Sequence, residues 1–141
     1  MIFFAKKGEG CMFLNSMSNE EKTLFLELAY KLANIDGDYA EEEEEIINSY
    51  KAELGIFDIG DTGSIDDIID FFATRNETVK KIVLFELYGM ICADNQIVDA
   101  EKVFFEKLRN KFQIPEYLVD RIIEVADELQ EVYDKVYEIL A

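Results

Sequence analysis

An internal repeat constrains the fold of this chain more than any other feature. Residues 36–47 read DGDYAEEEEEII, and residues 94–105, which begin 58 positions later, read DNQIVDAEKVFF. In both copies an Asp opens the turn, an apolar residue stands three positions later, and acids precede an apolar pair. Gly37 and Asn95 occupy matching positions, and both residue types tolerate a positive φ. The repeat predicts two units, each made of a helix, a short acidic turn and a second helix.

Apolar residues recur at helical spacing through most of the chain, and no strand pattern is found. Ser18 and Glu21 have the spacing of a capping box. Gly55 is a typical helix stop, and Pro115 suits the first position of a final helix. We therefore expect helices at about 18–35, 41–54, 64–72, 77–92, 99–112 and 115–140.

These patterns predict an all-α, single-domain bundle of about six to seven helices. Its two pseudo-repeated helix-turn-helix units span about 24–56 and 82–114, and a C-terminal helix covers 115–140. Residues 1–17 form a separate N-terminal leader, and the helical domain covers 18–141. The basic residues of the leader follow its short apolar run instead of preceding it, which makes it a poor signal peptide.

Cysteine usage and hydropathy favour a cytoplasmic protein. The only cysteines, Cys11 and Cys92, lie far apart and are interpreted as free thiols in a reducing compartment. No apolar run approaches the ~20 residues that span a bilayer. We therefore expect a cytoplasmic location and no membrane insertion.

The chain is strongly acidic, with 14 Lys and Arg against 31 Asp and Glu, a net charge of −17, and no His. This charge argues against nucleic acid and anionic membranes as partners, because both attract clustered Lys and Arg. Without His, the chain cannot form a Ser-His-Asp triad or a His-ligated metal site. Residues 36–70 hold 13 acids and one base, so the excess charge is centred on the first turn and the central loop.

The acidic turns match only the second half of an EF-hand loop, where a Gly makes the sharp turn and a Glu closes the loop. If Gly37 is the sixth loop position, Leu32 and Asn34 occupy the first and third. In the second unit these positions are Met90 and Cys92. Each loop lacks two or more carboxylate ligands, so neither is expected to bind calcium as an EF-hand does.

The two stretches LAYKLANIDGDYAEEEEEIINSYKAELGI and LYGMICADNQIVDAEKVFFEKLRNKFQI resemble the two halves of TerB-like domains. The resemblance covers roughly residues 18–115 and implies an all-helical domain linked to tellurite and other chemical stress in bacteria. It also implies that acids of the repeated motif bind a divalent cation. The motif departs from the family pattern at Asn95, in place of a second Gly, and at Ala40 and Val98, where a capping residue is common.

The acids of both turns form the candidate metal site, in which calcium, magnesium or manganese would take an all-oxygen shell. Its members are Asp36, Asp38, Glu42, Glu43, Asp94, Asp99 and Glu101. The alternative is that these acids only stabilise helix N-termini through capping and the helix dipole, and that Glu41–Glu45 is a solvated face.

The leading interpretation is a non-enzymatic, TerB-like acidic module that binds a divalent cation in a stress response. The alternative is a protein-interaction module or anionic mimic, whose acidic face holds a basic partner protein. An enzyme has no specific support, since the sequence holds no P-loop, nucleophile elbow or Gly-rich phosphate loop. The sequence leaves open whether the protein is a monomer or a homodimer.

Overall fold

The computed structural model describes residues 13–35, 41–91 and 99–141. This part of the chain contains one short 3-10 helix, six α-helices and no strand, which confirms the predicted all-α bundle. The elements are η1 (Leu14–Ser16), α2 (Asn19–Ala33), α3 (Glu41–Leu54), α4 (Ile65–Ala73), α5 (Glu77–Ile91), α6 (Asp99–Phe112) and α7 (Glu116–Leu140).

The helix bounds reproduce the sequence repeat. Helices α2 and α5 both have 15 residues, α3 and α6 both have 14, and each pair of equivalent bounds is 58 residues apart. The N-caps also match, because Ser18 accepts a hydrogen bond from the Glu21 amide and Asn76 accepts one from the Val79 amide, at 3.1 and 2.9 Å. The predicted capping box of Ser18 and Glu21 is present.

The ends of the two units match as well. Gly55, after α3, has a φ of 69°, and Gln113, after α6, has a φ of 53°. No other residue in the described ranges has a positive φ. Both helices therefore end on a left-handed residue, which a Gly adopts freely and a Gln adopts at a cost.

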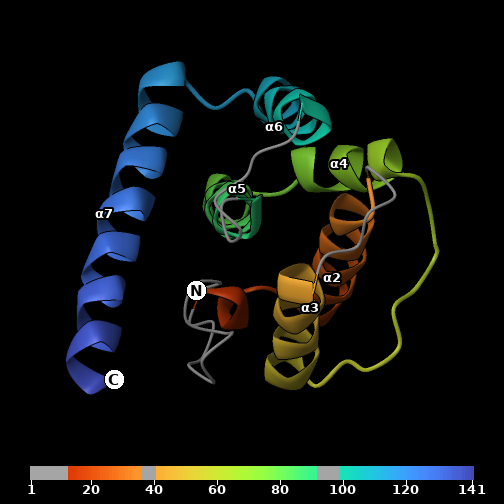
Figure 1. Ribbon diagram of the computed structural model, residues 1–141. Helices are drawn as coiled ribbons and strands as arrows, with labels where there is room; N and C mark the ends of the chain where they lie inside the picture. The colour runs from red at the N-terminus through yellow and green to blue at the C-terminus, as the bar shows by residue number, and fades with distance from the viewer. Residues whose placement is uncertain (1–12, 36–40, 92–98) are drawn as a thin grey trace.

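The two units pack through their first helices, with α5 at the centre of the molecule (Figure 1). Within the units, α2 contacts α3 and α5 contacts α6, while α4 contacts α2, α5 and α6. Helix α7 lies at one side of the bundle, against α5, and all the other helices lie to the same side of it (Figure 1). The buried core joins both units and includes Phe25, Leu28, Tyr50, Phe72, Leu84, Leu87, Leu108 and Phe112.

Residues 13–17 are the described part of the expected leader, and they pack on this core. Leu14 and Met17 are buried, and the ring of Phe13 meets the ring of Phe85 edge to face, with centroids 5.8 Å apart. The start of the domain is therefore joined to α5 by apolar contacts.

The last helix begins one residue later than expected. Pro115 has an extended conformation and occupies the N-cap, so α7 starts at Glu116 and extends over 25 residues, about 37 Å. Only Val119 and Ala126 of this helix are buried. None of the helices in the described ranges has both the length and the apolar character needed to cross a bilayer.

Candidate functional site

The structure describes only part of the predicted metal site. Asp36, Asp38 and Asp94 lie outside the described residues. Glu42 and Glu43 lie in the first turn of α3, and their side chains are also outside the described part. Asp99 and Glu101 lie in the first turn of α6, where Asp99 is exposed and Glu101 is buried.

The described residues that border the two turns lie close together. Ile35 precedes the first turn, Ala100 follows the second, and both line one hollow with the start of α4 at Ile65. Val103 and Phe104 of α6 complete its apolar lining. The end of α2 and the start of α6 therefore meet across α4. Within residues 13–35, 41–91 and 99–141, however, no three Asp, Glu or Cys side chains converge as a metal site.

A different carboxylate cluster, which the sequence reasoning missed, fastens the 55–64 loop to α2. Glu27 is fully buried on α2 and accepts hydrogen bonds from Thr62 and Gly63. The Thr62 hydroxyl lies 2.9 Å from Oε1, and the Thr62 amide lies 3.1 Å from Oε2. Lys31, one turn along α2, lies 3.0 Å from the same carboxylate. We call Glu27, Lys31 and Asp61–Gly63 the loop clasp.

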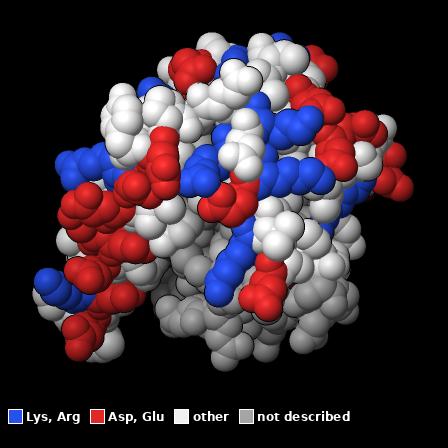
Figure 2. Space-filling model, turned by 90° about the horizontal axis from the view of Figure 1, so that it is seen from above, with Lys and Arg blue, Asp and Glu red and all other residues white. Residues whose placement is uncertain are grey.

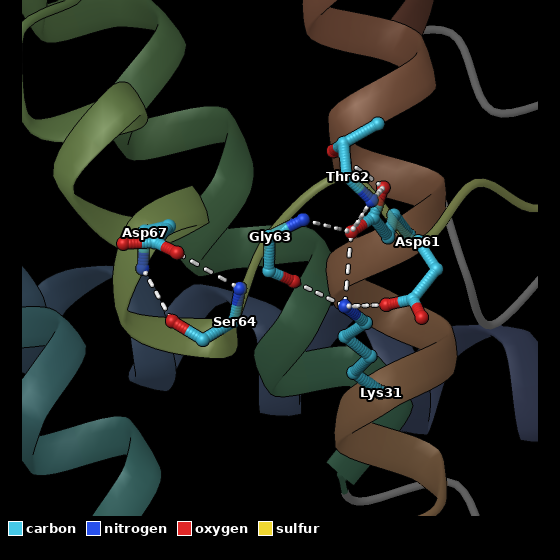
Figure 3. Close-up of polar contacts among 7 residues, drawn as sticks. Lys31, Asp61, Thr62, Gly63, Ser64 and Asp67 are labelled. Atoms are coloured by element: carbon cyan, nitrogen blue, oxygen red, sulfur yellow. Dashed lines mark hydrogen bonds and ion pairs between the residues drawn. The ribbon is translucent and has the colours of Figure 1, made fainter.

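Within the clasp, Lys31 bridges the carboxylate of Glu27 and the loop residues Asp61 and Gly63 (Figure 3). Its ammonium lies 2.8 Å from the Asp61 carboxylate and also donates to the Gly63 carbonyl. Next to it, Ser64 and Asp67 form the capping box that starts α4 (Figure 3). A Cβ on Gly60 would lie 3.2 Å from Glu27 Oε1, so the glycine lets the loop approach the carboxylate closely.

The charges of the clasp stabilise one another. Burial raises the pKa of Glu27, but hydrogen bonds from Lys31, Thr62 and Gly63 outweigh it and hold that pKa below its ordinary value. Hydrogen bonds to Asp61 and Glu27 raise the pKa of Lys31. All of these hydrogen bonds and ion pairs join residues of the same chain. The clasp is therefore a structural device that positions the central loop.

A second buried carboxylate connects the two units. Glu86 on α5 is fully buried and accepts a hydrogen bond from the Tyr50 hydroxyl of α3, with the oxygens 3.3 Å apart. The Tyr50 ring also packs edge to face on Phe25 of α2. Acids inside otherwise apolar helical runs, such as LFLELAY and VLFELYG, were the sequence signal for both buried carboxylates.

The fold gives the four aspartates of residues 61–70 partners within the chain. Asp61 pairs with Lys31, Asp66 with Lys107 of α6, and Asp70 with Lys111 of α6. Asp67 serves in the α4 capping box. In Figure 2 basic and acidic side chains mingle over α4 and α6, whereas acidic ones gather along α7 at the left.

Among the described residues, exposed acids are most concentrated on α7 and at Glu44 and Glu45 of α3, and further exposed acids such as Glu20, Glu53, Asp58 and Glu106 are scattered over the other elements. All eight acids of α7 are exposed: Glu116, Asp120, Glu124, Asp127, Glu128, Glu131, Asp134 and Glu138. The comparisons with known proteins add no relative, because no family model, curated protein or solved structure matches the chain.

Proposed function

We propose that the chain is a non-enzymatic, TerB-like acidic module that binds a divalent cation at its doubled turn, in the cytoplasmic response to tellurite or related chemical stress. The observation that carries this proposal is the convergence of Ile35 and Ala100, the described flanks of the two turns, on one hollow beside α4. Two turns whose flanks are this close can contribute carboxylates to one oxygen-rich site.

The equivalence of the two units supports a shared site. Since α3 and α6 start 58 residues apart and have equal lengths, Glu42 and Glu43 correspond to Ala100 and Glu101 of the second unit. In the proposed site, the first-turn acids Glu42, Glu43, Asp99 and Glu101 and the turn aspartates Asp36, Asp38 and Asp94 provide the ligands. Calcium, magnesium and manganese all accept such ligands, and their different coordination numbers would distinguish them.

Cation binding is tested by titrating each metal against the full chain while following the melting temperature and the calorimetric heat. A ligand at 100 times its Kd stabilises the native state by about 2.7 kcal/mol. The double variant Asp36→Asn with Asp94→Asn should abolish the shift, whereas Asp58→Asn, in the central loop, should keep it. An unchanged melting temperature at millimolar metal would refute the site.

A second candidate function is supported by the segregation of charge. The aspartates of 61–70 have partners within the chain, whereas only Glu116 and Glu124 of the eight α7 acids pair with a basic side chain of the described residues. The other acids of α7 and the Glu41–Glu45 run can therefore attract a basic protein partner. A captured partner should elute with increasing salt, and Glu44→Gln with Glu45→Gln should weaken its retention. The matched control is Glu53→Gln with Asp58→Asn, which removes the same charge from exposed residues elsewhere. Retention that is indifferent to salt would contradict this candidate.

A further inference from the structure

Helix α7 carries a heptad repeat that its packing on α5 does not explain. From Asp120 onward the sequence reads as three successive heptads, DRIIEVA, DELQEVY and DKVYEIL. Apolar residues alternate at spacings of four and three, which is the a/d seam of a coiled coil. The seam consists of the a residues Ile122, Leu129 and Val136 and the d residues Leu118, Val125, Val132 and Ile139.

The seam lies only partly on the face that α7 turns toward α5, where Leu118 and Leu129 pack against the core. The buried residues of α7, Val119 and Ala126, occupy e positions, next to the seam. The C-terminal part of the seam stays open among the described residues, because Val132 is 52% exposed, Val136 is 38% exposed and Ile139 is 81% exposed. A helix that needed only to cover α5 would not require these exposed apolar residues.

The open seam continues into a groove between α7 and α5. The groove has a volume of about 360 Å³ and is almost entirely apolar. Its apolar lining comes from Ile82 and Phe85 of α5, from Phe13 and from Ile122, Val125 and Leu129 of α7, and Thr78 and Lys81 of α5 also border it. A helix lying along the seam would therefore also rest on α5, which supplies the second side of a helix-binding surface.

We propose that this surface binds α7 of a second copy of the chain, in an antiparallel two-helix pair. The proposed layers join Leu129 to the partner's Val132, Val125 to the partner's Val136, and Ile122 to the partner's Ile139. Each layer occurs twice, as a two-fold interface requires. The pairing covers the exposed part of the seam in both copies.

The charges that flank the seam favour this occupant and this direction. The g positions hold Arg121, Glu128 and Lys135. In an antiparallel pair g residues face g residues, so Glu128 meets the partner's Lys135 twice. In a parallel pair they would face e positions, which here are apolar residues on the α5 side. Three of the four d residues are β-branched, unlike the Leu that parallel dimers prefer.

Six of the seven remaining acids of α7 lie at positions where a second copy can approach without burying them. Asp120, Asp127 and Asp134 occupy every f position, and Glu124, Glu131 and Glu138 occupy every c position, on the side away from the seam. The net charge of −17 still makes two copies repel each other at long range. Screening by salt should therefore strengthen the dimer, which is the opposite of an interface held by ion pairs alone.

Sedimentation equilibrium of the full chain, over a range of micromolar concentrations, tests the proposal. The mass should rise from 16.3 kDa toward twice that value, and Val132→Glu should weaken the dimer by about 100-fold or more. The control Val103→Glu alters a Val that is 69% exposed on α6 and should leave dimerisation unchanged. Circular dichroism checks that both variants stay folded. A monomer at every concentration would overturn the proposal and would leave residues 1–12 or a helix of another protein as the occupant. A tetramer would overturn it as well.

Charge reversal tests the direction of the pair. Glu128→Lys and Lys135→Glu should each weaken the dimer by about 5- to 10-fold, and the double reversal should restore it to within about 3-fold. A parallel pair would not show this rescue, since its g positions do not face one another. Failure of the double variant to recover would therefore overturn the antiparallel arrangement.

Discussion

The two helix-turn-helix units share their helix bounds and caps, but their first helices are covered in different ways. Helix α2 is covered by the 55–64 loop, which the clasp holds through the buried carboxylate of Glu27. Helix α5 is covered by α7, through apolar contacts. At the position equivalent to Glu27, 58 residues later, stands Phe85, which lines the groove beside α7.

This difference distinguishes the features that both units share from the features that depend on the neighbouring segment of each unit. Helix length, N-cap and left-handed end are properties of the repeat and occur in both units. The polarity of position 27 or 85 depends instead on the segment that covers it. A loop presents backbone amides, which a carboxylate can satisfy, whereas a helix presents side chains, which suit an aromatic ring.

Removing the carboxylate of the clasp should have the largest effect. Glu27→Ala leaves the Thr62 amide and hydroxyl without their acceptor and removes one partner of Lys31, so we expect a loss of about 3 kcal/mol in the free energy of unfolding. Phe85→Ala, at the equivalent position, should cost about 1–2 kcal/mol, because Phe85 is only half-buried. Urea unfolding of both variants measures the difference. A smaller loss for Glu27→Ala than for Phe85→Ala would contradict it.

The second-largest effect is expected from lowering the pH, which should reduce the contribution of the clasp to the free energy of unfolding. The hydrogen bonds around Glu27 keep its pKa below the ordinary value of 4.5, so the unfolded chain binds this proton at higher pH than the native one. The contribution of the clasp is complete above pH 4.5 and falls as the pH decreases through the native pKa. The stability gap between wild type and Glu27→Gln should therefore narrow as the pH falls below about 4.5. The gap between wild type and Phe85→Ala should stay constant over the same range.

The helical frame was predictable because its signals are local. The ends of α3 and α6 were predicted at the observed residues, from the repeat, the first-turn acids and Gly55. The clasp was not predicted, because it joins residues that are about 35 positions apart. The metal ligands stay a prediction, since three of the seven lie outside the described residues. The heptad of α7 was readable in the sequence, but only burial shows that the C-terminal part of its seam is left open.

The two left-handed helix ends allow the units to be compared at a single backbone position. A Cβ on Gly55 would have no neighbour within 4 Å, so Gly55→Gln tests backbone strain alone and should cost about 1 kcal/mol. Gln113→Gly, the reverse exchange in the second unit, should stabilise the chain by about 0.5–1 kcal/mol. Thermal unfolding of both variants measures the pair. If both exchanges changed the free energy of unfolding in the same direction, the two helix ends would not be equivalent.

The smallest effect is expected from the ion pairs between α4 and α6. Lys111 and Asp70 lie 3.4 Å apart, with side chains that are 53% and 61% exposed. Water screens such a pair, and ordering two flexible side chains offsets part of its attraction, so Lys111→Ala should cost less than about 0.5 kcal/mol and salt should reduce that cost further. The same Coulomb attraction acts at Lys31 and Glu27, but there the carboxylate is buried and holds three further hydrogen bonds. A Lys111→Ala loss as large as that of Glu27→Ala would mean that burial does not distinguish the loop clasp from the surface bridges.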